Sequence, residues 1–495
     1  MSNLRIVDVQ GRPIPRSEVE NEGASYGRRM ATWGISSSGP NATLWGDLSS
    51  LRSRTRRLTR NNPLAENGVE SLVSNLIGTG IVPRWQIKDS AIKEEVQQLW
   101  DDWSEESDFY GVSDIYGQQS TGARCLVESG EVLARFITRN NDTVPLQIQL
   151  IEPDHLDVSY ESIAPNGNKI RMGIEFNSEG RRVAYHLFKD HPGETFLFNN
   201  SFERVRVPAS EILHVFRPLR PGQMRGRPWL SSIIVKLHEI DQYSDAEIVR
   251  KKAAAMFGGF IIEPPGELSD MSSLGRVVDS DVNDSPVLAL EPGTFPKLKP
   301  GMDVRFSLPA DVGGNYLVWI KQQLREIAAG MGITYEQLTG DLEGVNYSSI
   351  RAGLLEFRRR CEALQWHIII FQFCQPIAKR WLDVAVGSGK IRISGYFRNR
   401  REYTRIDWRP QGWKWVDPLK DGMAAQLAER CGWTSQTAII AEQGYDAEMV
   451  DRQVIADNKR HDENGLIYDS DPRKTQKSGT SQAAETTVTT GAATQ

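Results

Sequence analysis

Residues 346–371 read NYSSIRAGLLEFRRRCEALQWHIIIF, and their spacing predicts a long amphipathic helix. Its apolar residues recur at alternating steps of four and three, a repeat typical of a helix that packs along its whole length. Asn346 and Ser348 can accept hydrogen bonds from the first N–H groups, and we expect the helix to run a little past Pro376. At roughly 33 residues it would be about 50 Å long and would need a partner in its own chain or in a neighbouring copy. An ordinary helical hairpin in a large core fits the same pattern. The apolar seam consists of Ile350, Leu354, Phe357, Cys361, Leu364, Ile368 and Phe371.

Two further helices precede this one, with a small module between them. We expect an unbroken helix of about 43 Å over Trp229–Phe257 and a second helix over Asn315–Gly330, each ended by glycine. Residues 260–310 are rich in Pro, Gly, Ser and Asp and predict a β module with a turn at 291–293. Two helices that lead to and from a β module form a stalk. The strands expected in the module are Val287–Leu290, Thr294–Leu298 and Val304–Leu308.

The part of the chain before residue 217 alternates between helical and strand patterns, which indicates an α+β domain. Residues 1–45 are rich in Gly, Ser, Pro and Asn, and we expect them to be extended or partly disordered. A short arginine-rich helix, Leu48–Arg60, could present a phosphate-binding face, a solvated face or a face toward another subunit. The expected helices are Leu48–Arg60, Pro63–Ile77 and Ser90–Glu106; the expected hairpins are Cys125–Glu128 with Val132–Thr138 and Ile170–Phe176 with Arg182–Phe188; Ile212–Phe216 is the last strand.

The region after Gly387 predicts a strand pair, a tryptophan-rich link and three helices. Asp417-Pro418 is an N-cap followed by proline at the first helical position, and opens a helix to about Arg430. Ser435 caps a helix to Glu442, and Asp446 starts a third to about Arg460. From Ser470 the composition is of low complexity and predicts disorder.

Bulk composition limits the classes of protein. The chain has 495 residues, 39% of them hydrophobic and 25% charged, which indicates a soluble protein of two to four domains. A net charge of −5 argues against a static nucleic-acid clamp. The sequence begins with no secretory signal, and no run of about 18 uncharged apolar residues occurs. Four widely spaced cysteines, Cys125, Cys361, Cys374 and Cys431, indicate a reducing compartment without a disulfide framework.

Catalytic motifs are not found. The stretch 384–391 resembles a phosphate loop, but Val384 replaces the first glycine and Ile391 replaces the Ser or Thr that would bind magnesium. Histidines and acids could gather around a metal, although the spacing of His186 and His191 is not a usual ligand spacing, and structural histidines are the favoured interpretation. A metal-dependent nuclease remains an alternative. Its candidate residues are Asp154, His155, His186 and His191, with Glu152 and His214 nearby in the pattern.

Several segments, in their order and spacing, carry a resemblance to a known family. From about residue 20 to 460 the sequence resembles the lambda-like portal proteins of tailed bacteriophages. The resemblance implies no catalysis and no cofactor, and a ring, usually of twelve subunits, at one vertex of the head. Double-stranded DNA would be pumped in by the terminase large subunit and leave by the same channel. The segments are RNNPLAENG (60–68), LVSNLIGTGI (72–81), IEPDH (151–155), RPLRPGQMRG (217–226), NYSSIR (346–351) and WVDPLK (415–420).

The resemblance also implies a division of the chain. The expected parts are a flexible arm (1–45), an α+β wing (46–228), stem helix one (229–258), a β clip (259–311), stem helix two (312–332), a tunnel loop (333–349), a long helix returning to the wing (348–400), a helical crown (401–465) and a disordered tail (466–495). Implied partners are further copies of the chain, terminase, the major capsid and scaffold proteins, head–tail connectors and DNA bound without sequence specificity, with no membrane. The particle would assemble in the host cytoplasm. A tail or connector adaptor without DNA contact is a second alternative.

Candidate contact residues follow from these parts. Uniformly basic channel walls would trap DNA, whereas isolated basic positions in a mildly acidic ring would let it slide. We expect Asp341 and Glu343 to repel the DNA backbone and Asn346 and Tyr347 to touch it weakly. The basic channel candidates are Arg250, Lys251, Lys252, Lys321 and Arg325; the clip candidates facing terminase or connectors are Glu267, Asp270, Arg276, Asp284, Lys297 and Lys299.

Overall fold

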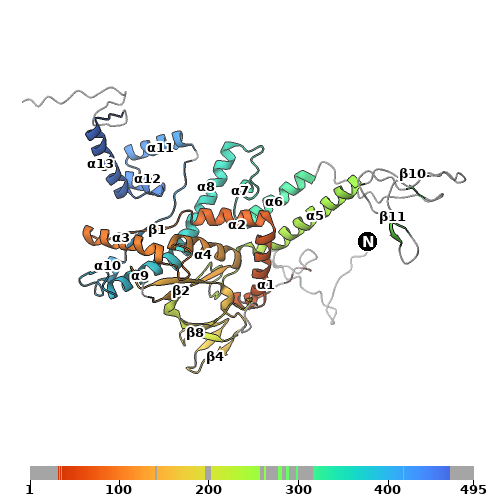
Figure 1. Ribbon diagram of the computed structural model, residues 1–495, viewed down its shortest axis with the longest axis horizontal. Coiled ribbons are helices and arrows are strands. Elements are labelled where there is room, and N and C mark those ends of the chain that lie inside the picture. The colour runs from red at the N-terminus through yellow and green to blue at the C-terminus, as the bar shows by residue number, and fades with distance from the viewer. Residues whose placement is uncertain are drawn as a thin grey trace, which may run out of the picture.

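The computed structural model describes residues 36–139, 142–194, 202–256, 316–415 and 417–468, the single residues 32 and 34, and four short strands between 261 and 298. The fold is α+β and rich in helix, as the sequence predicts. Figure 1 shows a body of helices and sheets, a helix pair that leaves it on one side, and a group of three helices joined to it by an extended segment. Among the described residues, none of the helices combines the length and apolar character that crossing a bilayer requires.

The body is built on a three-stranded antiparallel sheet with strand order β3-β2-β9. Helix α2 has a well-defined N-terminus. The side chain of Asn62 accepts hydrogen bonds from the N–H groups of Leu64 and Ala65, and Pro63 is the first residue of the helix. One continuous core joins these helices to the sheet. The elements are α1 (Pro40–Asn61), α2 (Pro63–Leu76), α3 (Ser90–Glu106), α4 (Ile115–Ser129), β2 (Glu131–Ile137), β3 (Gln147–Ile151) and β9 (Ile212–Phe216).

The predicted hairpin between Cys125–Glu128 and Val132–Thr138 is wrong on its first arm, because residues 125–128 belong to helix α4. Asp114 caps this helix by accepting from the N–H of Gly117. Gly130 ends it with φ of 86°, and a Cβ there would lie 2.2 Å from the carbonyl carbon of Arg227. Ser129-Gly130 is therefore the C-terminal end of a helix. Glycine is as common at this position as it is in a hairpin turn, because both require a positive φ. Helix α1 likewise begins at Pro40, inside the stretch expected to be extended; residues 1–31 lie outside the described part.

A second sheet, with order β4-β5-β6-β7-β8, covers the lower side of the body in Figure 1. The predicted hairpin across 177–180 is confirmed by the pairing of β6 with β7. The expected single strand Ile170–Phe176 is instead two strands, because Met172 and Gly173 both have positive φ and turn the chain. The strands are β4 (Ser162–Ile163), β5 (Lys169–Arg171), β6 (Ile174–Phe176), β7 (Arg182–Phe188) and β8 (Arg204–Pro208).

The predicted helix pair of the stalk is present. A 3-10 turn at Trp229–Ser232 precedes α5 (Ile234–Met256), so the first helix is not unbroken from Trp229; α6 spans Tyr316–Met331. The two helices run side by side away from the body, with Tyr243 stacked on Tyr316 at 5.9 Å between ring centroids. Between them the strands are β10 (Ile261–Ile262), β11 (Val277–Ser280), β12 (Pro286–Leu288) and β13 (Lys297–Leu298).

Two of the expected strands of this module overlap with described strands, Val287–Leu290 with β12 and Thr294–Leu298 with β13. Strand β12 pairs with β11, and β13 pairs with β10. The turn expected at 291–293 lies outside the described residues. The expected strand Val304–Leu308 lies outside the described residues.

The long helix continues further than the sequence indicates, in three pieces that follow without a break. They are α8 (Tyr347–Leu364), a π-helical segment (Gln365–Cys374) and α9 (Gln375–Gly387). The seam holds through Phe357, Cys361, Leu364 and Ile368, which are buried, but Phe371 is 72% exposed. A π-helix turns less per residue than an α-helix, so the buried face moves from 371 to 373 and 374.

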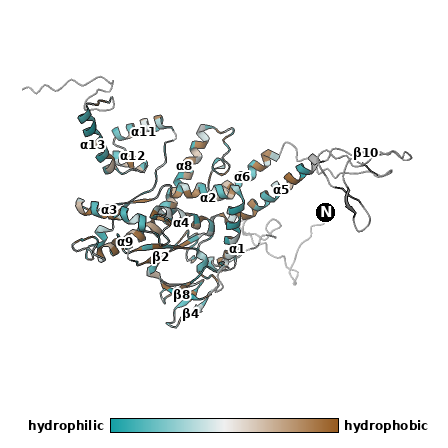
Figure 2. Ribbon diagram, viewed as in Figure 1, coloured by the Kyte–Doolittle hydropathy of each residue, from teal (hydrophilic) through white to brown (hydrophobic). Residues whose placement is uncertain are grey.

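The last part of the chain confirms the helices predicted from their caps. Strand β14 (Ile406–Arg409) pairs with β1 (Val82–Trp85), so the one strand described after Gly387 joins an early segment instead of forming a local pair. A short helix, α10 (Arg400–Tyr403), precedes the tryptophan-rich link, and the three helices after it are α11 (Pro418–Arg430), α12 (Gln436–Glu442) and α13 (Ala447–Asn464). Figure 2 shows α13 as mostly hydrophilic, and α5 and α6 as mixtures of both kinds of residue along their length.

Candidate functional site

The segment between α6 and α8 carries three of the channel candidates, Asp341, Glu343 and Asn346. It contains a short helix, α7 (Tyr335–Thr339), that was expected as loop. Thr334 and Gln337 form a reciprocal capping box, and Gly340 ends the helix with φ of 69°. Asn346 accepts a hydrogen bond from the N–H of Ser348 and starts α8, which confirms it as a helix cap. The exposed loop is thereby shortened to 341–346, held at both ends.

Lys321 is not an isolated basic position. Its Nζ lies 3.3 Å from a carboxylate oxygen of Asp341 and 3.4 Å from one of Glu343. The hydrogen bond to Asp341, and then Glu343, raises the pKa of Lys321. The N–H of Glu343, the hydroxyl of Tyr335 at 2.9 Å and Lys321 lower the pKa of Asp341. The three charges predicted separately therefore form one cluster with a net negative charge, which fastens the loop to the stalk helix.

The other basic candidates differ in how much charge remains available. Arg250 donates to Glu247 at 2.7 Å, and Lys251 lies 3.9 Å from the same carboxylate. Arg325 lies over the ring of Tyr335 at 5.7 Å. Lys252 is exposed, and no ion pair joins it to another described residue. Lys252 is therefore the candidate whose charge is least compensated within the described chain.

The remaining candidates are placed only in part. Tyr347 is the first residue of α8, and Lys297 begins β13; their side chains are not described. Glu267, Asp270, Arg276, Asp284 and Lys299 lie outside the described residues.

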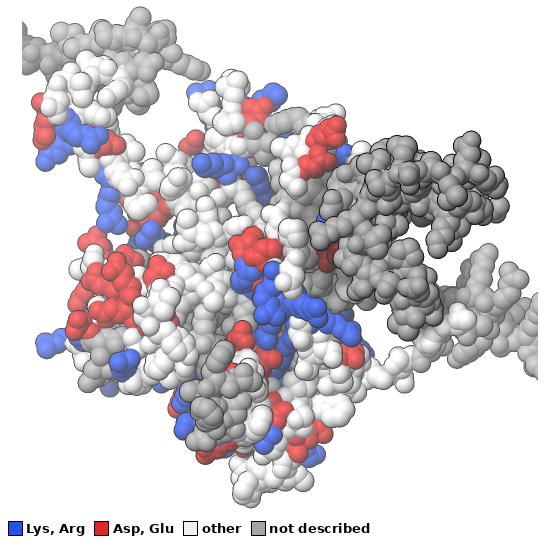
Figure 3. Space-filling view, turned by 45° about the vertical axis from the view of Figure 1, so that its right-hand side comes forward, with Lys and Arg blue, Asp and Glu red and all other residues white. Residues whose placement is uncertain are grey.

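The arginines of helix α1 fall into two sets, one that points into the protein and one that is exposed. The sequence alone left open what the arginine-rich face of this helix contacts. Arg52 and Arg56 point inward, to Glu131 and to Asp154. Arg54, Arg57 and Arg60 are exposed and make no ion pair with another described residue. Figure 3 shows a group of Lys and Arg side chains at the height of α1. Beside Arg54 and Arg57 a groove of about 680 Å³ reaches Val235 and His238 of α5.

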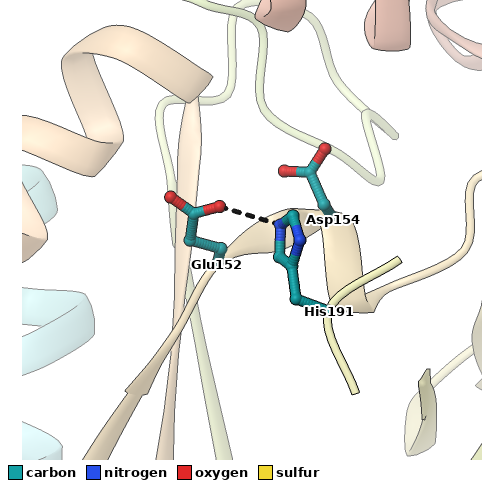
Figure 4. A group of neighbouring side chains, drawn as sticks. All are labelled: Glu152, Asp154 and His191. Atoms are coloured by element: carbon teal, nitrogen blue, oxygen red, sulfur yellow. Dashed lines mark ion pairs between the residues drawn. The ribbon is translucent and has the colours of Figure 1, made fainter. Parts of the chain in front are cut away.

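Three residues that could serve as metal ligands lie close together: Glu152, Asp154 and His191. Their ligand atoms lie within 4.8 Å of one another (Figure 4). The guanidinium of Arg56 already pairs with both acids, at 2.6 Å from Asp154 and 3.5 Å from Glu152. The Nδ1 of His191 accepts from the N–H of Gly193, so Nε2 carries the proton that faces Glu152 at 3.0 Å. The cluster is a compensated set of charges and does not fit a metal.

The other two candidates of the nuclease alternative do not join this cluster as ligands. His186 faces the buried Glu175 at 3.2 Å, and His155 has its Nδ1 3.0 Å from the carbonyl of Phe188. The predicted constellation of Asp154, His155, His186 and His191 is therefore not assembled.

The sequence pattern missed a buried charged centre on β2. Glu131 is fully buried and accepts from Arg52, from Arg225 at 2.7 Å, from the N–H of Gly226 at 2.5 Å, and faces His214 at 2.9 Å. Arg225 also donates to the carbonyls of Pro153, Leu156 and Met172. These contacts join α1, both sheets and the segment that leads to α5. The sequence analysis interpreted residues 217–227, with their four arginines, as a linker. Only the tertiary structure reveals that Arg225 is buried.

The charged centre predicts a pH dependence of stability. Burial lowers the pKa of His214 to about 4, although Glu131 opposes this. Burial alone would raise the pKa of Glu131, but Arg225, Arg52 and His214 hold it well below its usual range. Both groups take up a proton more readily in the unfolded chain. These two groups therefore contribute their full share to the free energy of unfolding above about pH 6.5. As the pH falls below 6.5, that free energy decreases, because His214 binds a proton more weakly in the folded chain than in the unfolded one. Below about pH 4.5, Glu131 adds to the decrease for the same reason.

We expect the melting temperature to fall as the pH is lowered from 6.5 to 4, and His214→Gln to flatten that fall. Melting curves by calorimetry at half-unit steps measure both slopes. His238→Gln, which changes an exposed histidine of α5, is the matched control and should keep the wild-type slope. Equal slopes for the wild type and His214→Gln would contradict the assignment.

Comparison with known proteins gives a consistent result. Residues 26–365 match the family described as phage portal protein, lambda family. A probable portal protein of Halomonas phage phiHAP-1 is 28% identical over 443 residues, covering 86% of this chain and 82% of the relative. Portal protein B of Escherichia phage lambda is 22% identical over 486 residues, covering 90% of both chains. Among solved structures, a chain in the neck of a native gene transfer agent particle, computed with C12 symmetry, has a TM-score of 0.43 and 14% identity over 80% of this chain and 93% of its own.

Proposed function

The chain belongs to the lambda family of phage portal proteins, and from this premise we propose that copies of it form a ring through which double-stranded DNA enters and leaves a capsid. In this proposal the ring has about twelve copies, no catalytic activity of its own, and docking surfaces for the terminase large subunit and head–tail connectors. That the chain is a portal protein of a phage or phage-like particle follows from its family and its curated relatives.

The observation that carries the proposal is the exposed apolar surface of the stalk helices. Close to the body, Leu237 and Ile240 of α5 are buried. Further along, Ile248 and Val249 are exposed, as are Leu317 and Val318 of α6. Leaving such residues in water on a projecting helix pair is unfavourable. Copies arranged around an axis would cover them, because in a heterologous ring each subunit offers one surface and receives another.

We assign the parts of the chain accordingly. The body up to about residue 228 is the wing, α5 and α6 are the stem, the strands between them belong to the clip, and the loop 341–346 lies at the channel. Helices α11, α12 and α13 form the crown. Major capsid and scaffold proteins would contact the outer side of the ring, which places the protein at the portal vertex of the virion after assembly in the host cytoplasm.

The charges described above suit a channel that guides DNA without holding it. The loop cluster presents Asp341 and Glu343 with Lys321 between them, so its net charge repels phosphates. Arg250 and Lys251 share Glu247, and Lys252 is left as the least compensated cation. A duplex carries a charge about every 1.7 Å, so a ring with few free cations binds it weakly and lets it slide.

Reversing the charge of Lys252 is expected to reduce DNA packaging while ring assembly continues. The Lys252→Glu change is repeated in every copy, and would line one level of the channel with carboxylates that repel the duplex. We expect at least about a tenfold loss of packaged DNA per particle. Measurement is by nuclease protection of DNA in assembled particles.

Lys189→Glu is the matched control, because Lys189 is an exposed lysine at the end of β7 in the wing. It should package normally. If Lys252→Glu packages as well as this control, the adaptor without DNA contact becomes the better account of the protein.

Electron microscopy of the purified protein tests the ring itself. Particles with a central opening wide enough for a duplex are expected. A monomer at every concentration would overturn the proposal. The nuclease alternative is tested separately, by incubating DNA with the protein and magnesium or manganese, where intact DNA is expected because Arg56 already compensates the acidic cluster.

A further inference from the structure

The three crown helices share no apolar core with the body of the chain. None of the described residues of α11, α12 or α13 is buried, and none belongs to the core that joins the other helices to the sheet. Figure 1 shows these helices as a separate group, joined to the body by an extended segment. Helices of 13, 7 and 18 residues are marginal in water unless an apolar face is packed. Their position against the body therefore depends on contacts of another kind.

Ion pairs join the crown to the body at two places. The first two turns of α13 face β1 and α3, and the first turn of α11 faces α8. The crown supplies the acid in most of these pairs. They are Asp446–Arg84 at 3.6 Å, Glu448–Lys93 at 2.6 Å, Arg452–Glu94 at 3.5 Å and Asp421–Arg351 at 2.5 Å.

The contact between α13 and α3 is open to solvent. The same charged side chains line a cleft of about 690 Å³ between the two helices. Arg452 and Glu94 are 63% and 67% exposed. The Nε of Arg84 donates to no described residue, because Asp446 lies beyond hydrogen-bond distance. Exposed ion pairs contribute little to stability and weaken with salt, so the attachment of α13 to α3 depends on ionic strength.

The segment that enters the crown is fastened without charges. The side chains of Gln411 and Trp413 hydrogen-bond to residues 79 and 75, at the end of α2, at 2.9 Å and 3.1 Å. Gly412 lies between them against the turn that joins α12 to α13, where a Cβ would be 2.3 Å from the carbonyl carbon of Gln443. One end of the crown is thus held at 411–413 whatever the salt concentration, and a rotation of the three helices would pivot there.

We infer that the crown is held in the observed position by an electrostatic latch, the pairs Lys93–Glu448 and Arg452–Glu94, and swings away from α3 about residues 411–413 when the latch is screened. Because exposed ion pairs are individually weak, the two positions differ little in free energy, and ionic strength selects between them. The latch lies within one chain. It therefore goes beyond the proposed function and does not depend on the ring.

A carbodiimide detects the closed latch, because it joins a lysine amine to a carboxylate only where the two are in contact. The reagent activates the carboxylate of Glu448; the Nζ of Lys93 then displaces it as a urea, and an amide bond forms. The purified full-length chain is treated at about 0.1 M and about 1 M salt, where charges are screened beyond about 10 Å and about 3 Å. Mass spectrometry of the digested single-chain band from a denaturing gel measures the amide.

We expect the yield of the Lys93–Glu448 amide to fall at least about fivefold at the higher salt concentration. Lys88 and Glu402 are the control pair, 2.9 Å apart and both within the body, so that they meet again after each separation. Their amide should keep most of its yield. Equal losses for the two pairs, or no loss for either, would overturn the inference.

Charge reversal tests the latch by a second route. Lys93→Glu places two acids together and should speed hydrogen exchange of the α13 amides at least about tenfold, because a released crown helix frays. Adding Glu448→Lys restores an opposite pair and should return the exchange to the wild-type rate, whereas Lys88→Glu should leave it unchanged throughout. A double variant that exchanges as fast as Lys93→Glu would overturn the inference. Rescue in a chain that forms no rings would overturn the proposed function alone.

Discussion

Replacing Glu131 by alanine is expected to lower the free energy of unfolding of the body by about 3–5 kcal/mol. The carboxylate is fully buried and compensates Arg52 and Arg225, which are buried as well. Without it, two guanidinium groups remain in the interior with one fixed negative partner fewer, and the N–H of Gly226 loses its acceptor. A cost of this size is among the largest that a single change can produce in such a domain.

Thermal unfolding of the wild type and the variant measures this effect. Glu131→Gln keeps the shape and one acceptor, so its loss should be smaller than that of Glu131→Ala. Glu179→Gln removes a carboxylate that pairs with Arg181 at 3.2 Å on the surface, and should change the free energy of unfolding by less than about 1 kcal/mol. The role given to Glu131 fails if Glu131→Ala and Glu179→Gln melt at the same temperature.

Helices α2, α11 and α12 were predictable because the signals for their first turns are local. Asp417-Pro418 and Ser435 place a capping side chain or a proline next to the first turn, and the structure uses both as expected. Helix α2 begins at Pro63, as predicted, and its cap is Asn62. Such signals depend on neighbours three residues away and need no knowledge of the tertiary fold.

The errors arose where one local signal serves two structures. Ser129-Gly130 suits both a hairpin turn and a helix end, and Asp114 far upstream decides for the helix α4. The π-helical segment changes which face of the long helix is buried, and the heptad pattern alone does not reveal that change at Phe371.

The sequence identified residues of the candidate site but did not predict which of them contact one another. Lys321, Asp341 and Glu343 were all singled out, yet the sequence separates them by about twenty residues and gives no sign that they pair. Burial of Arg225 and Glu131 is equally invisible, since charged residues are mostly exposed and a pattern offers no reason to expect otherwise. The portal assignment itself came from the order and spacing of short segments along nearly the whole chain, a signal that survives such local errors.

Replacing Trp381 by alanine is expected to lower the free energy of unfolding of the body by about 3–5 kcal/mol. Trp381 of α9 lies at the centre of four buried tryptophans, with its ring centroid 5.6 Å from Trp85, 5.1 Å from Trp100 and 6.0 Å from Trp103. These residues come from β1, α3 and α9, so the cluster joins the end of the long helix to the first part of the wing. Removal of the central ring would leave a cavity bounded by three rigid side chains that cannot collapse into it.

Urea unfolding followed by circular dichroism measures the loss without depending on tryptophan emission. Trp381→Phe tests volume alone, because the indole N–H of Trp381 has no hydrogen-bond partner among the described residues, and its loss should be clearly smaller than that of the alanine variant. Trp45→Ala, which removes a 53% exposed tryptophan of α1, should change the free energy of unfolding by about 0.5 kcal/mol or less. If Trp381→Ala unfolds at the same urea concentration as Trp45→Ala, then this cluster does not hold α9 against β1 and α3.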